Sequence, residues 1–139
     1  MLEINPQNLY AYLQRGWVYQ AKADHERAIA DFDRAISIAP KDITPVIARG
    51  VSLEARKDYA GAVASFSDAV SIDPNSSRAY YYRAGVHYAV KSVELALADY
   101  QTLLNLPTLN DTDRNYHSMA KSRILLLTNP SAVPLTDPK

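Results

Sequence analysis

The sequence contains no cysteine and only four glycines among its 139 residues. The lack of cysteine excludes disulfides, thiolate nucleophiles and cysteine-ligated zinc, and it is compatible with any redox compartment. The four glycines do not cluster, so the chain has no Gly-rich loop of the kind that cradles phosphate. The sequence therefore excludes thiolate catalysis and phosphate binding by a glycine-rich loop.

Net charge and long apolar runs are missing as well. Fifteen basic and fifteen acidic residues give a formal net charge of +0, so no overall field draws nucleic acid or anionic membrane to the molecule. The longest purely aliphatic run, Ile124 to Leu127, is far shorter than the roughly 20 residues that cross a bilayer. The amino end shows no basic region followed by an apolar one. We therefore expect no nucleic-acid partner, no membrane association and a cytoplasmic location.

What the sequence has is an internal repeat. FDRAISIAP at residues 32–40 returns as FSDAVSIDP at residues 66–74, so the interval is 34 residues. The same interval relates further landmarks: Pro6, Pro40 and Pro74; Gly16 and Gly50; Ala28, Ala62 and Ala96; Phe32, Phe66 and Tyr100. Self-similarity at such a period indicates a stack of small structural units that share one core. A composition of 47% hydrophobic and 22% charged residues suits one folded domain.

Within each copy the apolar residues recur three to four positions apart, which predicts two amphipathic helices per repeat. The prolines fall between these pairs, because proline has no N–H and disfavours a helical conformation in the residue before it. Helices are predicted over residues 7–21, 25–38, 44–56, 59–72, 77–90, 93–105 and 111–127.

Short polar side chains stand where helices should begin and can accept the first free backbone N–H groups. Asp24, Asp58 and Ser92 are predicted to cap the second helix of each repeat. Thr44, followed by Pro45, is predicted to cap the third helix of the chain. For the last helix the predicted cap is Asp111 or Thr112.

These landmarks resemble the tetratricopeptide repeat (TPR) family, whose pattern places an aromatic, glycine and tyrosine in one helix and alanine, an aromatic and proline around the next. The matching residues are Tyr12, Gly16, Tyr19, Ala28, Phe32, Ala35 and Pro40, then Gly50, Tyr59, Ala62, Phe66, Ala69 and Pro74, then Tyr80, Ala84, Ala96, Tyr100 and Leu103. Arg15, Arg49 and Arg83 stand where the family usually has leucine. The resemblance implies an all-α, right-handed superhelical solenoid of antiparallel helix hairpins with about seven helices.

The repeat phase also sets the expected organisation. We expect a remnant of a preceding repeat at residues 1–6, repeats at 7–40, 41–74 and 75–108, a C-terminal capping helix at 109–128 and a proline-rich flexible tail at 129–139. In the turn before each second helix, many family members have a glycine with positive φ. This chain has Ala23, Lys57 and Lys91 there.

Each repeat has a small residue in its first helix and an aromatic residue in its second helix, 16 positions later. Gly16, Gly50 and Ala84 are predicted to allow close helix approach, and the aromatic side chains 16 residues later are predicted to fill the space between helices. The repeat is thus explained by core packing.

Nothing in the pattern indicates catalysis, so we expect no enzyme activity, no cofactor and no metal site. His25, His87 and His117 lie on separate elements without paired carboxylates, and a histidine at a packing position is more often structural than a ligand. Asp31, Asp33, Asp68 and Asp99 are interpreted as solvated faces of second helices.

By resemblance, the first helices of the repeats line the concave side of the solenoid. The side chains expected on that side are Tyr10, Leu13, Gln14, Trp17 and Gln20, then Ile47, Val51 and Glu54, then Arg78, Tyr81, Tyr82 and Tyr88. Lysine and asparagine, which family members use to hold a chaperone's C-terminal carboxylates, are absent from these places. We predict a protein-interaction scaffold within a larger assembly that binds a peptide or partner segment through apolar and aromatic anchors.

Two alternatives remain open, and a third is disfavoured. Trp17, Tyr81 and Tyr82 could pack between neighbouring hairpins, as we expect of Tyr12 and Tyr80. Self-association into a dimer or stacked oligomer could use Leu2, Ile4, Tyr10 and Trp17. RNA binding is disfavoured, because the expected groove carries one obvious cation, Arg78.

Overall fold

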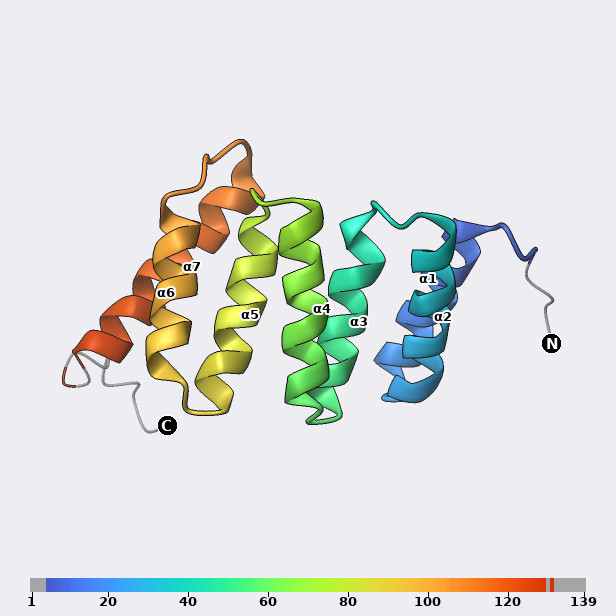
Figure 1. Ribbon diagram of the computed structural model, residues 1–139, viewed down its shortest axis with the longest axis horizontal. Helices are drawn as coiled ribbons and strands as arrows, with labels where there is room; N and C mark the ends of the chain where they lie inside the picture. Colours follow the sequence, from blue (N-terminus) through green and yellow to red (C-terminus); the bar gives the residue numbers. More distant parts are fainter. Residues whose placement is uncertain (1–4, 130, 132–139) are drawn as a thin grey trace, which may run out of the picture. The chain divides into compact units, whose positions relative to one another are not determined.

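The computed structural model describes residues 5–129 and 131, and this part of the chain contains seven α-helices and no strand (Figure 1). The helices are α1 (Leu9–Ala21), α2 (His25–Ile38), α3 (Ile43–Ala55), α4 (Tyr59–Ile72), α5 (Ser77–Ala89), α6 (Val93–Leu104) and α7 (Asp111–Thr128). Each predicted helix is present, with ends within two residues of the prediction. The all-α fold class is confirmed.

Side-chain caps explain where two of the second helices begin. Asp24 accepts from the N–H of Arg27 at the start of α2, and Asp58 accepts from the N–H of Gly61 at the start of α4, as predicted. The prediction that the Ser92 side chain caps α6 was wrong. Ser92 does precede α6, but its hydroxyl makes no capping hydrogen bond.

The caps of α3 and α7 lie one or two residues earlier than predicted. Asp42 Oδ1 accepts from the N–H of Thr44 at 2.9 Å, so Asp42 caps α3 and Thr44 lies inside its first turn. Asn110 Oδ1 accepts from the N–H of Asp113 at 2.9 Å and caps α7 in place of Asp111 or Thr112. In each case an Asx side chain just upstream reaches the free N–H groups first.

The turn inside each hairpin has the left-handed backbone that the repeat pattern suggested. Ala23, Lys57 and Lys91 have φ values of 60°, 64° and 66°. In the first hairpin the N–H of the next residue, Asp24, donates to Tyr19 O at 2.9 Å, which closes α1 in a Schellman-like arrangement. Three residues with a Cβ atom therefore occupy positions that favour glycine.

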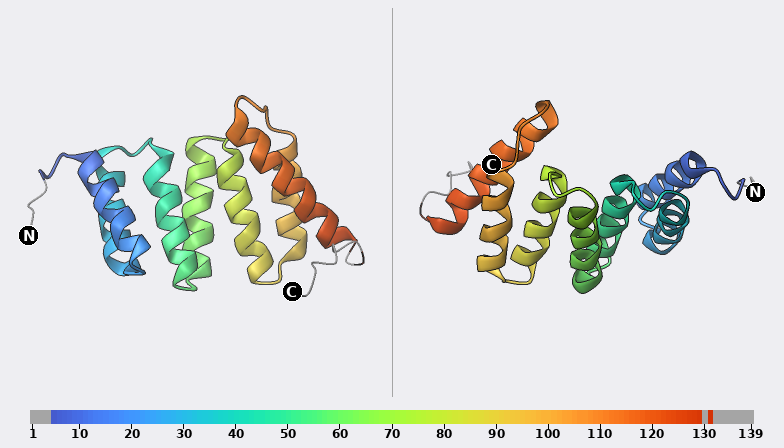
Figure 2. Two further views of the ribbon diagram at one scale, coloured as in Figure 1. Left: turned by 180° about the vertical axis from the view of Figure 1, so that it is seen from behind. Right: turned by 45° about the horizontal axis from the view of Figure 1, so that its top comes forward.

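The helices form two compact units, residues 1–74 and 75–139. In the first unit, α1 packs on α2 and α3 packs on α4 as hairpins, while α2 packs on α3 and α1 touches α3 (Figure 2). In the second unit, α5 and α6 form a hairpin and α7 packs against both of them.

Close helix approach in the first hairpin depends on Gly16. A Cβ atom on Gly16 would lie 2.6 Å from Cε1 of Phe32, whose side chain is completely buried. The aromatic ring thus occupies the place that any larger residue at position 16 would need, as the small-to-large pairing predicted. The core around this contact comprises Leu13, Ala28, Phe32, Ala35 and Ala48, flanked by Leu9, Tyr12 and Tyr19.

The second unit is closed by α7, which supplies Ala120 to the core and adds Tyr116, Ile124 and Leu127 at its edge. The buried members of this core are Ala84, Ala96, Tyr100, Leu103 and Ala120. Two hydrogen bonds hold the start of α7 in place: Ser77 Oγ donates to Asp113 Oδ1 at 2.6 Å, and the N–H of Leu109 donates to Asp113 Oδ2 at 3.0 Å. The α5–α6 hairpin therefore has a fixed partner helix.

The expected repeat remnant at residues 1–6 and the expected proline-rich tail at 129–139 lie largely outside the described residues.

Candidate functional site

The candidate surface in the first unit consists of Tyr10, Gln14, Trp17 and Gln20 of α1 with Val51 and Glu54 of α3, and we name it the α1–α3 face. Tyr10 is 70% exposed and Trp17 is 37% exposed, although both are large aromatic side chains. Gln14 is also exposed, while Gln20, Val51 and Glu54 are half-buried. Two aromatic rings are thus available to solvent on one helix.

Two residues predicted for this surface lie in the core instead. Leu13 packs with Phe32 and is 7% exposed, and Ile47 of α3 is buried. Sequence spacing places them on the same side of their helices as Trp17 and Val51, but helix packing covers them. We therefore leave Leu13 and Ile47 out of the α1–α3 face.

Gln20 fixes the position of α1 beside α3. Its Nε2 donates to the hydroxyl of Ser52 at 2.8 Å and to the backbone oxygen of Ala48 at 3.3 Å. Ser52 is completely buried, so these hydrogen bonds are shielded from water on the α3 side. The C-terminal halves of α1 and α3 are consequently held together by a side chain of the face itself.

Glu54 holds in α3 the place that Gln20 holds in α1, thirty-four residues earlier. A carboxylate has no hydrogen to donate, so it cannot repeat the bonds that the Gln20 amide makes. Burial raises the pKa of Glu54 above its ordinary value. No hydrogen bond or ion pair joins its carboxylate to another side chain within the described residues.

The cations of α1 and α3 are already engaged elsewhere. Arg15 of α1 pairs with Asp31, and Arg49 of α3 pairs with Asp33 and Asp68. Arg56, the residue that follows α3, lies 3.8 Å from the carboxylate of Glu26. Glu54 is therefore a half-buried anion without an internal counter-ion in the part of the chain that the structure describes.

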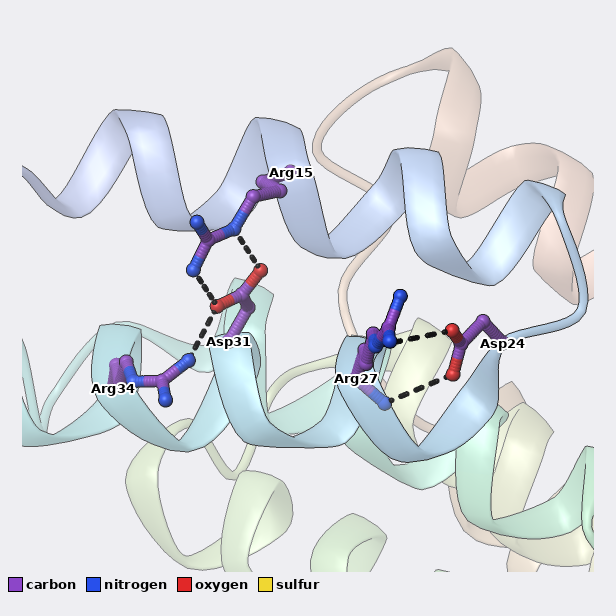
Figure 3. Close-up of polar contacts among 5 residues, drawn as sticks. All are labelled: Arg15, Asp24, Arg27, Asp31 and Arg34. Atoms are coloured by element: carbon purple, nitrogen blue, oxygen red, sulfur yellow. Dashed lines mark hydrogen bonds and ion pairs between the residues drawn. The ribbon is translucent and has the colours of Figure 1, made fainter. Parts of the chain in front are cut away.

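Asp31 is the central acceptor of an arginine pair (Figure 3). Arg15 of α1 donates to both of its carboxylate oxygens, at 2.7 and 2.8 Å, and Arg34 of α2 donates to Oδ1 at 2.7 Å. The Asp31 side chain has 0% exposure, so its interpretation as part of a solvated helix face was wrong. The hydrogen bond from the guanidinium to Asp31 raises the pKa of Arg15.

Asp99 repeats this arrangement in the second unit, and its prediction as a solvated residue was wrong too. Arg83 of α5 donates to both oxygens of Asp99 at 2.8 and 2.7 Å, and the aspartate is buried. Nε2 of His87 lies 3.7 Å from the same carboxylate, and burial is the main cause that lowers the pKa of His87. The ion pairs occupy the places where the family resemblance suggested leucine at positions 15 and 83.

The middle repeat has a serine where the others have this aspartate. Arg49 donates through Nε to Ser65 Oγ at 2.9 Å, and its Nη1 reaches Asp33 of α2 at 2.9 Å. Its Nη2 lies 3.5 Å from Asp68 of α4. Asp33 and Asp68 are exposed, as predicted, but both contact this guanidinium.

In the second unit the predicted tyrosines divide into two groups. Tyr81 and Tyr82 are half-buried beside Tyr116 of α7, with ring centroids 5.3 and 6.4 Å from that ring, and Tyr81 also approaches Tyr100 at 5.8 Å. Burial raises the pKa of Tyr116 to about 12. Tyr88 is 51% exposed and Arg78 is half-buried. Intramolecular packing thus uses most of the ring surface of Tyr81 and Tyr82.

No set of three or more metal-ligating side chains comes together in the described residues. His117 bridges two backbone oxygens, of Asp113 at 2.9 Å and Leu106 at 3.0 Å, which ties α7 to the end of the preceding segment. His25 Nδ1 is buried without a hydrogen-bond partner in this part of the chain. Among the described helices none is long and apolar enough to span a bilayer.

Comparison with known proteins identifies the fold. Residues 9–42 match the family described as tetratricopeptide repeat. No curated protein matches the sequence closely enough to count as a relative.

Solved TPR structures superpose on most of the chain. The type III secretion chaperone SycD of Yersinia enterocolitica, in complex with a peptide of the translocator YopD, has a TM-score of 0.81 at 15% identity and covers 94% of this chain and 99% of its own. The TPR2AB domain of yeast Sti1 has a TM-score of 0.80 at 22% identity, with coverage of 90% and 48%. The first TPR domain of human RPAP3 has a TM-score of 0.69 at 20% identity, with coverage of 90% and 98%. At these identities the likeness shows the fold.

Proposed function

We propose that this chain, which carries a tetratricopeptide repeat at residues 9–42 and has the fold of TPR domains, binds a peptide segment of a partner protein on its α1–α3 face. Solved structures with this fold include complexes with an HSP90 peptide and with a YopD peptide. A helix-repeat scaffold whose described residues bring together no set of three or more metal-ligating side chains suits binding rather than chemistry.

The observation that carries the proposal is the exposure of Trp17. Tryptophan and tyrosine dominate binding hot spots because a large, rigid ring gains contact area at a small cost in entropy. Leu13 and Gly16 are the buried residues of α1, whereas Trp17 and Tyr10 are accessible to solvent. Neither ring belongs to the hydrophobic core cluster of the first hairpin.

The test is peptide binding by Trp17→Ala beside a matched control, Val18→Ala. Val18 is the next residue of α1 and is 50% exposed, but it points about 100° away around the helix. Peptides selected from a random phage library against the whole chain serve as probes, and fluorescence anisotropy gives their Kd. We expect Trp17→Ala to weaken binding at least about ten-fold, as for a hot spot, and Val18→Ala to leave Kd unchanged. Equal affinities of both variants and the wild type would argue against the α1–α3 face.

Self-association is the second candidate, and the exposure of Tyr10 favours it, because an exposed aromatic side chain at the start of α1 can pack against another copy. Sedimentation velocity over a hundred-fold concentration range separates the two functions. A monomer throughout supports peptide binding, whereas a Tyr10-dependent dimer supports self-association.

A further inference from the structure

We infer that the segment bound on the α1–α3 face carries a lysine or arginine that pairs with Glu54, beside an apolar or aromatic residue that packs on Trp17. The inference rests on the proposed function and adds the chemistry of the partner. It concerns one surface within the first unit and one unpaired charge.

Glu54 carries the unpaired charge of the α1–α3 face. A half-buried carboxylate loses part of its hydration, and this cost is normally offset by a cation or by donated hydrogen bonds. Glu54 receives neither from the described residues. Arg15 of α1, Arg49 of α3 and Arg56, which follows α3, are paired with other carboxylates, those of Asp31, Asp33 and Glu26. A cation supplied by a partner would complete the site.

Trp17 provides the apolar contact of the same face. Trp17 and Gln20 lie three residues apart on α1, and Val51 and Glu54 lie three residues apart on α3, so each pair shares one face of its helix. In each pair the apolar member precedes the polar one by one turn. Trp17 and Val51 thus stand at one level of the two helices and Gln20 and Glu54 at the next, so a segment that crosses diagonally from α1 to α3 can contact both Trp17 and Glu54.

Helix spacing sets the expected separation within the ligand. Packed helices have axes about 8–10 Å apart, and an extended chain advances about 3.3 Å per residue. The basic residue should follow or precede the apolar anchor by about three positions. This spacing distinguishes the proposed ligand from a peptide that is merely cationic.

The same charge argues against an acidic ligand. Related TPR structures hold the acidic HSP90 peptide SRMEEVD. On the α1–α3 face the single formal charge among its six members is the carboxylate of Glu54, so a peptide rich in glutamate would meet repulsion. SRMEEVD is consequently a negative control for this chain.

The experiment crosses a protein variant with a peptide variant. Peptides selected on the wild-type chain are synthesised with their lysine or arginine retained or replaced by glutamine, and Kd is measured for wild type, Glu54→Gln and Trp17→Ala. We expect the selected peptides to contain a basic residue and Glu54→Gln to weaken their binding about ten-fold. The neutral peptides should bind wild type and Glu54→Gln equally, and SRMEEVD should not compete.

Each outcome decides between the two proposals. If Trp17→Ala abolishes binding while Glu54→Gln changes Kd less than two-fold, the surface stands and the charge pairing is overturned. If selection enriches no basic residue, or SRMEEVD competes through Trp17, the pairing is also overturned. If no peptide depends on Trp17, the proposed function fails, and the inference with it. Circular dichroism of Glu54→Gln, which keeps the side-chain shape, confirms that the variant is folded.

Discussion

The ring of Phe66 fills the space that a side chain at Gly50 would need, since a Cβ atom there would lie 2.5 Å from Phe66 Cε1. The same relationship joins Gly16 and Phe32 one repeat earlier. In both hairpins a residue with no Cβ lets an aromatic ring lie directly against the helix backbone.

Gly50→Ala should therefore destabilise the protein even though alanine favours helices. We expect a loss of about 1–3 kcal/mol, typical of an overpacked core. The control is Gly85→Ala in α5, where the added Cβ would meet nothing within 4 Å apart from its chain neighbours and the backbone of its own helix. There the better helix propensity should give a gain of about 0.5–1 kcal/mol. Urea denaturation measures the free energy of unfolding of both variants. A Gly50→Ala variant as stable as wild type would show that α3 and α4 can shift apart to make room for the methyl group at no cost in stability.

Ala23→Gly should be neutral or stabilising. The φ of 60° at Ala23 strains a residue with a Cβ by about 1–2 kcal/mol, and glycine relieves this strain but has more entropy to lose on folding. The matched control, Ala21→Gly, changes a residue in the last turn of α1 and should lose about 0.5–1 kcal/mol. Thermal melting in the same buffer compares the two. A lower melting temperature for Ala23→Gly would contradict the left-handed turn.

Asp31→Asn should destabilise the first hairpin, because it removes the charge that pairs with Arg15 and Arg34. We expect a loss of about 1–3 kcal/mol for a buried acceptor of charged donors. Asp68→Asn is the control, since the Asp68 side chain is 65% exposed and 3.5 Å from Arg49. It should change stability by less than about 0.5 kcal/mol. Equal losses in chemical denaturation would refute the special role of the buried carboxylate.

Acidification should loosen α7 through Asp113. The hydrogen bond from Ser77, with that from the Leu109 N–H, lowers the pKa of Asp113 below its ordinary value of 3.8. The stability linked to this group is thus present above that ordinary value and is lost as the pH falls through the lower pKa of the folded state. Hydrogen exchange of α7 amides between pH 5 and about pH 3 should show faster opening at the acid end.

Ser77→Ala is the matched variant for this pH effect. It removes the largest cause of the lowered pKa, so the pH dependence of α7 opening should shrink. An unchanged pH profile in Ser77→Ala would contradict the role of this hydrogen bond.

Helices and their spacing could be predicted from the sequence, because apolar periodicity, prolines and the 34-residue interval all depend on local geometry. The burial of Asp31 and Asp99 was not predicted, since an aspartate on a helix surface is usually solvated. A usable signal was present: each lies 16 residues after an arginine, at Arg15 and Arg83, in the same repeat phase. The arginines that departed from the family pattern were the evidence for their partners.

The candidate surface could be predicted only in part. Trp17 and Tyr10 are exposed as expected, but Leu13 is buried, because spacing along one helix does not tell how deeply its neighbour covers it. Tyr81 packs with Tyr116, a residue of α7 that lies 35 positions away and outside the repeat pattern. The repeat spacing cannot predict contacts with α7, because this helix is not part of the repeat.

The serine at position 65 has a mechanical consequence. Because position 65 has no carboxylate to accept two of its N–H groups, Arg49 donates through Nε to Ser65 and through Nη1 to Asp33 on the neighbouring hairpin, while its Nη2 lies 3.5 Å from Asp68. Stacked repeats fray at the seams between hairpins, where contacts are sparsest. A guanidinium shared across this seam adds to the free energy needed to separate the first hairpin from the second, and so couples their unfolding.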